Sequence, residues 1–157
     1  MSTQETDLED GIDPILRLGW EEWISLPDLG LPALKAKVDT GARTSALHAS
    51  DIETFGPVKE PKVRFMMRPI PGRDDLVIPC SAPIVDRRDV TSSNGESELR
   101  YVILSRLSVG GIDWDIELTL TDRGTMQNRM LLGRQALQDN IAIMPSERFY
   151  QPELDYD

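Results

Sequence analysis

Residues 37–45 restrict the possible folds of this chain more than any other stretch, because they carry a carboxylate from an apolar strand directly into a tight turn. The preceding residues 34–38 alternate between apolar and basic side chains, as a strand packed on one face does. In the turn itself, Thr40 offers a hydroxyl to nearby backbone, and Gly41 adopts conformations closed to residues with a Cβ. Taken alone, the triplet that starts at Asp39 also fits an ordinary strand-ending turn.

A second segment, later in the chain, helps to interpret this turn. Residues 130–132 are apolar and lead into Gly133, and Arg134 to Asp139 is the only stretch of the chain that favours a helix. An Asp-Thr-Gly turn followed later by an apolar-apolar-Gly-Arg segment resembles the retroviral-type (retropepsin) proteases. In that class the second segment packs behind the catalytic turn.

Further motifs make the chain similar to the bacterial RimK-associated, retropepsin-like peptidase family, which has often carried the label "ATP-dependent zinc protease". They are Gly19–Trp23, Leu26–Gly30, Arg87–Arg88, Ser92–Glu96, Arg100–Ile103 and Thr119–Arg123. The resemblance covers about residues 18–145. It implies a system in which an ATP-grasp ligase adds glutamates to the C-terminal tail of a ribosomal protein and the peptidase trims them.

Alternation along the body of the chain predicts an all-β domain, and with the resemblance a small closed acid-protease (retropepsin-like) β-barrel with one short C-terminal helix. Residues 62–68 and 112–120 alternate clearly between apolar and polar side chains. Gly110-Gly111 predicts a tight hairpin between the second of these and the strand before it, Leu99 to Val109. The turn signal Asn94-Gly95 predicts another hairpin, over residues 88–101, placed like a protease flap.

The chain divides into three parts by composition. Residues 1–17 are expected to form a flexible acidic N-terminal tail, residues 18–150 the peptidase domain, and residues 151–157 an acidic C-terminal tail. No apolar run is long enough to span a membrane. The single cysteine excludes an internal disulfide and agrees with a cytoplasmic location.

The charge balance limits the classes of partner. With 17 basic and 27 acidic residues the net charge is −10, which argues against direct nucleic-acid binding or a lipid-surface role. An acidic enzyme that acts on an acidic substrate must concentrate its arginines at the site.

The predicted catalytic group is Asp39, within the turn Asp39, Thr40 and Gly41. Acid-base peptide hydrolysis needs two carboxylates that share a proton, and the chain has one Asp-Thr-Gly triplet. A two-fold homodimer would bring Asp39 and its symmetry mate together. The rival arrangement is a monomer that uses a second acid of the same chain. The candidates are Asp86, Asp89 and Asp122.

The residue after Ala42 departs from the retropepsin pattern, which commonly has an acid there. Arg43 in this position favours carboxylates through charge-assisted hydrogen bonds. The predicted substrate-binding set, which fits a glutamate-rich ligand, comprises Ala42, Arg43, Arg87, Arg88, Ser93, Asn94, Arg100 and Arg134. Any one of these arginines alone fits a solvated surface residue equally well.

Neither a metal nor another cofactor is predicted. A zinc site takes three or four ligands with recognisable spacing, whereas His48 is the only histidine and Cys80 the only cysteine. His48 is therefore expected to be structural or to line the substrate site, and Cys80 to be packed. The chain has no Gly-rich phosphate loop, so a dependence on ATP is not expected from its residues.

These features predict an aspartic endopeptidase that cleaves glutamate-rich or polyglutamylated protein tails, with an ATP-grasp glutamate ligase as a possible partner. The alternative is a catalytically idle retropepsin-like module that binds acidic tails or the ligase. A metallopeptidase is the third hypothesis for the function.

Overall fold

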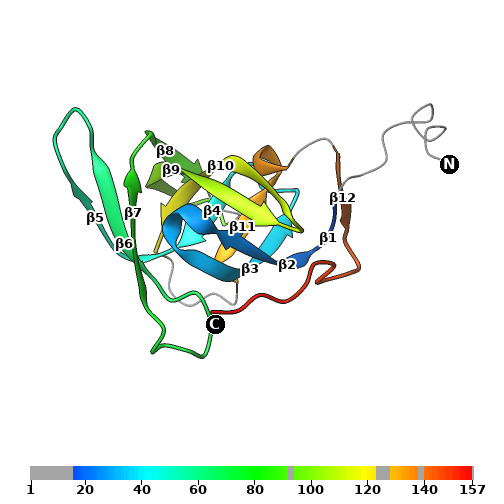
Figure 1. Cartoon of the computed structure of the whole chain (residues 1–157). Coiled ribbons are helices and arrows are strands. Elements are labelled where there is room, and N and C mark those ends of the chain that lie inside the picture. The colour runs from blue at the N-terminus through cyan, green and yellow to red at the C-terminus, as the bar shows by residue number, and fades with distance from the viewer. Residues whose placement is uncertain (1–15, 92–93, 123–127, 138–139, 157) are drawn as a thin grey trace.

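The structure is a computed structural model that describes residues 16–91, 94–122, 128–137 and 140–156. Almost all of its regular structure is β-strand (Figure 1), which confirms the all-β prediction. Ser93 of the predicted substrate-binding set lies outside the described residues, as does most of the predicted N-terminal tail.

Six strands close into a barrel. They are β2 (Glu21–Leu26), β3 (Leu31–Asp39), β4 (Ser45–His48), β9 (Ser97–Val109), β10 (Ile112–Thr121) and β11 (Met130–Gly133). The order around the barrel is β10-β4-β11-β3-β2-β9, and the pairing of β9 with β10 closes the ring. An additional strand, β8 (Asp86–Thr91), pairs with the outer edge of β9. The retropepsin-like barrel predicted from the sequence is confirmed.

One hydrophobic core joins the barrel strands to the neighbouring strands β1 and β6. The largest fully buried side chains are Phe65, Leu18, Ile24, Leu26, Leu31, Leu34, Leu47, Met67, Ile103, Leu107, Leu118 and Met130. On β10, Ile116, Leu118 and Leu120 face inward as the alternation predicts. Thr119 and Thr121 are buried as well, because the other face of that strand is covered near its end.

Both predicted hairpins are present. Gly110 and Gly111, with φ of 61° and 81°, turn β9 into β10 so that Val109 faces Ile112. The second hairpin joins β8 to β9, with Asp86 opposite Val102 at one end of the ladder and Thr91 opposite Ser97 at the other. The paired strands of this hairpin thus begin before residue 88 and end after residue 101, so the hairpin is longer than predicted.

Two small sheets accompany the barrel. One is three-stranded, with β5 (Ser50–Phe55), β6 (Lys62–Met67) and β7 (Ile78–Pro83), and its β5–β6 hairpin projects away from the barrel in Figure 1. Inward residues of β6 are buried in the predicted alternation. The other sheet pairs β1 (Leu16–Gly19) in parallel with β12 (Ile141–Met144).

The boundary of the N-terminal tail differs from the prediction. Residues 16 and 17 belong to β1, and Leu16 is buried against the core. The strand exists because Leu16 pairs with Ile141, a distant partner that no local pattern reveals.

The predicted short helix begins at Arg134 as expected, but it is a 3₁₀ turn, η3 (Arg134–Ala136), because Leu137 already has extended backbone angles of φ −88° and ψ 142°. The backbone N–H groups of Arg134 and Gln135 donate to the carbonyl oxygens of residues 42 and 43. These are N–H groups for which a helix start offers no acceptor of its own. A second 3₁₀ turn, η2 (Pro27–Leu29), was not predicted.

A buried carboxylate joins the two ends of the described chain. Glu22 is fully buried and accepts hydrogen bonds from the backbone N–H groups of Gly19, Tyr150 and Gln151, at 2.7, 2.8 and 3.0 Å. Further on, the Tyr156 hydroxyl donates to the carbonyl oxygen of Ala33 at 2.6 Å. Residues 150–156 are thus held against β1, β2 and β3.

Burial raises the pKa of the Cys80 thiol to about 11, and it is also the main cause that raises the pKa of Tyr156 to about 12. The unfolded thiol ionises near its ordinary value of 9.0, so above that pH the unfolded state loses its proton first. We expect stability to be unaffected by this group below pH 9 and to fall as the pH rises from about 9 to 11. Urea unfolding measured across this range checks the expectation.

Cys80→Ala removes the thiol and should flatten the decline just above pH 9, while the part due to Tyr156 remains at higher pH. An equally steep decline in wild type and variant would contradict this assignment.

Candidate active site

The Asp39 carboxylate stands at the end of β3, where the chain leaves the barrel wall. The Gly41 N–H donates to its Oδ1 at 3.0 Å, and the Ala42 N–H donates to the Asp39 carbonyl oxygen at 3.1 Å. The side chain is half-buried, whereas Thr40 and Gly41 are exposed. The turn thus holds the Asp39 carboxylate in one orientation near the surface.

The second sequence segment braces this turn from behind. β11 runs parallel to β3 with Gly133 opposite Asp39. The Arg134 N–H donates to the Ala42 carbonyl oxygen at 2.8 Å, and the Gln135 N–H donates to that of Arg43 at 3.1 Å. The loop that follows Asp39 is therefore held by backbone bonds along its length.

The contact between the two segments is too close for a side chain at Gly133. A Cβ there would lie 2.6 Å from the Thr44 carbonyl oxygen and 3.0 Å from that of Ala42. The Gly133 N–H in turn donates to Ser45 Oγ at 3.0 Å. Ser45 is buried, and it is a site residue that the sequence did not single out.

Two of the predicted arginines lie at the turn. Arg134 donates through Nη1 to the Gly41 carbonyl oxygen at 3.3 Å and remains exposed. Arg43 is exposed, and among the described residues its side chain has no ion pair or hydrogen bond. Arg43 is thus the arginine next to Asp39 whose guanidinium is available to a ligand.

Arg87 and Arg88 point to opposite faces of the β8–β9 hairpin, because they are neighbours on one strand. Arg88 donates to Asp86 and to Glu117, both at 2.7 Å. The Arg88 hydrogen bond is the main cause that lowers the pKa of Asp86. Arg87 lies over the ring of Tyr101, 5.4 Å from its centroid. The structure therefore does not bring these two side chains together as one cluster.

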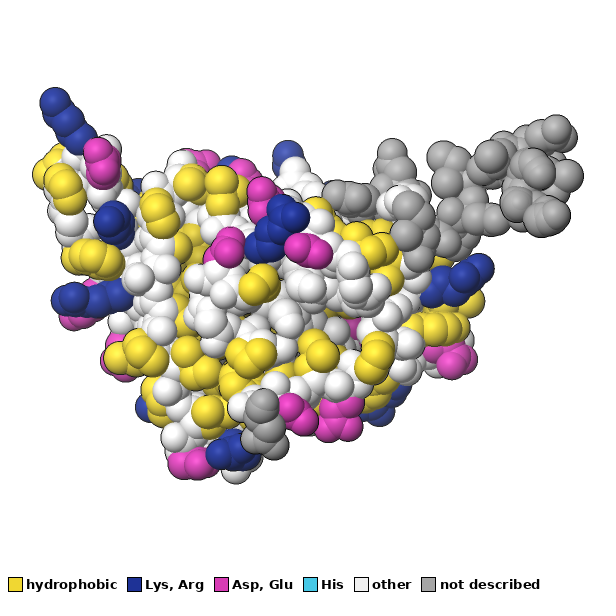
Figure 2. All heavy atoms as spheres, viewed as in Figure 1, with side chains coloured by type: hydrophobic (Ala, Val, Ile, Leu, Met, Phe, Trp, Pro, Cys, Tyr) yellow, Lys and Arg dark blue, Asp and Glu magenta, His cyan; other side chains and the backbone are white. Residues whose placement is uncertain are grey.

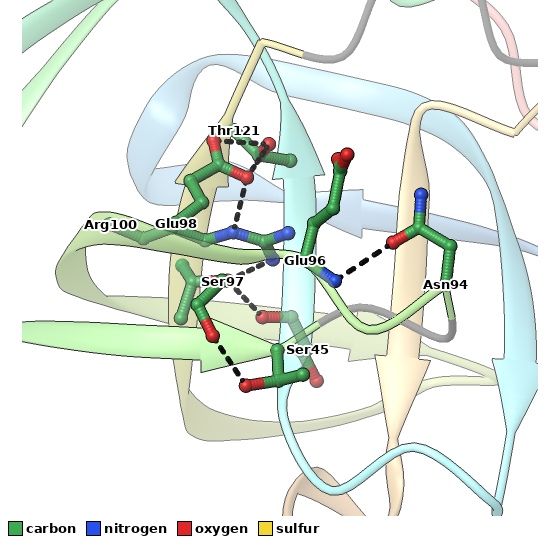
Figure 3. A network of polar contacts seen from close by, with 9 residues as sticks. Ser45, Asn94, Glu96, Ser97, Glu98, Arg100 and Thr121 are labelled. Carbon is green, nitrogen blue, oxygen red and sulfur yellow. Dashed lines mark hydrogen bonds and ion pairs between the residues drawn. The ribbon is translucent and has the colours of Figure 1, made fainter.

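Arg100 is buried rather than open to a ligand (Figure 3). Its guanidinium pairs with Glu98 and bonds to Thr119. Asn94 lies at the exposed hairpin tip, where its side chain accepts the Glu96 N–H at 3.1 Å. The predicted binding set thus separates into residues at the turn, residues of the hairpin surface and one residue inside the wall.

A hollow of about 350 Å³ lies beside the loop that follows Asp39. Thr44 and Ser45 line it on the side of that loop and Gln135 on the side of η3. Arg88 lines it from the hairpin and Glu117 from β10. Basic and acidic side chains are interspersed over the face of the molecule in Figure 2 as well.

The described residues do not offer a zinc site. They contain no group of three His, Cys, Asp or Glu side chains placed to hold a metal ion. His48 is buried and lines a separate hollow of about 210 Å³, and Cys80 is packed near Leu29. Within the same residues, no helix has the length and apolar character needed to cross a membrane.

The fold and the braced Asp39 turn define a retropepsin-like domain. The sequence matches the family described as "Retropepsin-like aspartic endopeptidase RimB" over residues 17–154, and the chain belongs to this RimB-like family.

Similar regions occur in longer proteins, and a similar fold occurs in a solved structure. A protein of Shewanella pealeana named "Probable alpha-L-glutamate ligase" is 50% identical over 132 residues, 84% of this chain and 29% of that protein. A protein of the same name from Parasynechococcus marenigrum is 44% identical over 128 residues, 82% and 28% of the two chains. The chain thus spans less than a third of the length of these relatives. The crystal structure of Lpg0085 from Legionella pneumophila has a TM-score of 0.71 and 28% identity, and covers 87% of this chain and 98% of that chain.

Gly133→Ala should destabilise the fold by about 3 kcal/mol, because the added methyl group meets backbone rather than a flexible side chain. Gly72→Ala is the matched control: its Cβ would meet nothing within 4 Å, and only its φ of 88° opposes the change, which costs about 1 kcal/mol. Urea unfolding of both variants checks the difference. A Gly133→Ala protein as stable as the control would show that the contact can relax.

Proposed function

We propose that this protein is an aspartic endopeptidase that uses Asp39 to cleave glutamate-rich protein tails. The observation that carries the proposal is the Asp39 turn, which β11 and η3 brace through the Ala42 and Arg43 carbonyl groups. A catalytic carboxylate has to be held in a set orientation, and this packing supplies it.

The chemistry requires a second carboxylate, for which a two-fold dimer with a second Asp39 is proposed. Two adjacent carboxylates cannot both ionise at low cost, so one holds the proton. The ionised one takes a proton from water as the water oxygen attacks the scissile carbonyl carbon. The protonated one donates its proton to the carbonyl oxygen, and proton transfer to the amide nitrogen then releases the amine.

The charges of the side chains next to the Asp39 turn indicate which class of substrate the site would bind. The chain carries a net charge of −10, yet the residues next to the turn include Arg43 with an unengaged guanidinium and the exposed Arg134. Arginine recognises carboxylates through two parallel hydrogen bonds. The local positive charge supports a substrate with closely spaced glutamate side chains.

The relatives support a glutamate ligase as the partner. The proteins named "Probable alpha-L-glutamate ligase" contain a region similar to this domain, and that region is less than a third of their length. A ligase that builds a glutamate tail and a peptidase that shortens it would act on the same tail. We propose that the tail of a ribosomal protein, in the cytoplasm, is this shared substrate.

A second function has support from the same relatives. A domain that only holds acidic tails for a ligase would also recur within ligase chains and would also use Arg43. It would differ in needing no chemistry at Asp39.

Asp39→Asn should abolish hydrolysis of a polyglutamylated peptide without unfolding the protein, because the amide is nearly isosteric but cannot transfer the proton. Mass spectrometry of the peptide measures the products. Asp89→Asn and Asp122→Asn are controls that also test the rival acids of the same chain, and both should retain activity. Turnover that persists in Asp39→Asn would sink the peptidase assignment. Peptide binding without turnover in the wild type would favour the second function.

The same variant tests the dimer. Mixing it in excess with wild type should reduce activity below the wild-type share, because a mixed dimer has one functional carboxylate. Activity that follows the amount of wild-type chain, in a protein that scatters light as a monomer, would favour an acid of the same chain.

Arg43→Glu should reduce cleavage of acidic peptides by at least tenfold while changing the free energy of unfolding by about 0.5 kcal/mol or less. The comparison substrate is a peptide in which glutamines replace the glutamates. If both proteins cleave the two peptides equally well, Arg43 does not recognise substrate charge.

A further inference from the structure

A buried guanidinium links the base of the β8–β9 hairpin to β10 (Figure 3). Arg100 is 6% exposed, and its Nε donates to Glu98 Oε1 at 3.2 Å while its Nη1 donates to Thr119 Oγ1 at 3.3 Å. The Thr121 hydroxyl lies 3.1 and 3.0 Å from the two oxygens of Glu98. Side chains therefore reinforce the attachment of the hairpin to the barrel wall.

The same series of bonds continues to the catalytic turn. The Thr119 hydroxyl, which accepts from Arg100, donates to the Ser45 carbonyl oxygen at 2.9 Å. Ser45 Oγ accepts the N–H of Gly133 at 3.0 Å, and Gly133 stands opposite Asp39 in the β3–β11 pair. The Thr119 hydroxyl and Ser45 thus connect the hairpin to β11, the strand that braces the Asp39 carboxylate.

The links between Arg100 and Ser45 are shielded from water, whereas the Glu98 side chain at the outer end of the series is 38% exposed. Thr119 is 1% exposed and Ser45 is 2% exposed, so water has almost no access to the bonds between them. A buried arginine is held by the fixed geometry of its donors, and it cannot move out without separating from Glu98. A hydroxyl that accepts from a cation is also polarised to donate more strongly.

We propose that Arg100 and Thr119 are positioning residues that keep the hairpin and the Asp39 turn in one fixed relation. The inference rests on the proposed peptidase function, together with the sequence prediction that the β8–β9 hairpin is placed like a protease flap. It gives Arg100 a role that differs from substrate binding: the residue acts through Thr119 and Ser45 on the turn, and the exposed Arg43 is left to contact the substrate.

Thr119→Val is the decisive variant because valine has nearly the same shape as threonine and lacks the hydroxyl. In the full chain with a polyglutamylated peptide, kcat should fall about tenfold, the effect of losing one hydrogen bond to a charged group, while KM changes less than twofold. Thr119→Ser restores the hydroxyl and should recover most of kcat. Thr91→Val is the matched control, since it removes the 2.8 Å Thr91–Ser97 contact on the exposed part of the same hairpin; it should leave kcat unchanged.

Amide hydrogen exchange gives a readout that does not depend on activity. In Thr119→Val, exchange at Gly133 should accelerate about tenfold together with exchange in residues 98–102, and Thr91→Val should not change Gly133. Unchanged exchange at Gly133 with unchanged kcat would overturn the proposal, as would an equal loss of kcat in Thr119→Ser. If the wild type cleaves no peptide, the proposed function fails, and exchange at Gly133 alone decides whether the hairpin and the turn are coupled.

Discussion

The parallel pairing of β3 with β11 holds the Asp39 turn in the wall of the barrel. It places Leu132 against Val38 and Gly133 against Asp39, and with β4 it completes the barrel between the two halves of the chain. Gly133 also lies close to the backbone of the loop that follows Asp39, an approach that is possible because position 133 lacks a side chain. The same loop accepts the hydrogen bonds of Arg134 and Gln135, so the position of η3 depends on this approach as well.

Among the described residues, six of the chain's 13 arginines form ion pairs with carboxylates of the same chain. Arg64, Arg73, Arg88, Arg106 and Arg148 each pair with a carboxylate, and Arg100 is paired inside the wall. Exposed pairs of this kind contribute little to stability, but they lower the number of cations open to a ligand. Against that background Arg43 is distinctive by its position and by its free guanidinium, which is why charge recognition in the proposed function centres on it.

The sequence predicted the features that depend on neighbours in the chain. Strict alternation located β6 and β10, two glycines located the β9–β10 turn, and the Asp39 turn and Gly133 were both singled out. Features that depend on distant partners were missed or misjudged: the pairing of Leu16 with Ile141, the buried carboxylate of Glu22, and the helix that ends at Ala136. Arg100 was expected with the exposed arginines because a residue pattern does not show which face of β9 the barrel covers.

The spacing between the two halves of the site has a consequence for synthesis of the protein. Val38 and Leu132 meet only after more than ninety intervening residues have been made, so the nascent chain carries Asp39 through that stretch of translation without the strand that holds it. Contacts between such distant segments also form slowly. The proposed activity therefore depends on closure of the barrel, because Asp39 has no bracing strand before β11 pairs with β3.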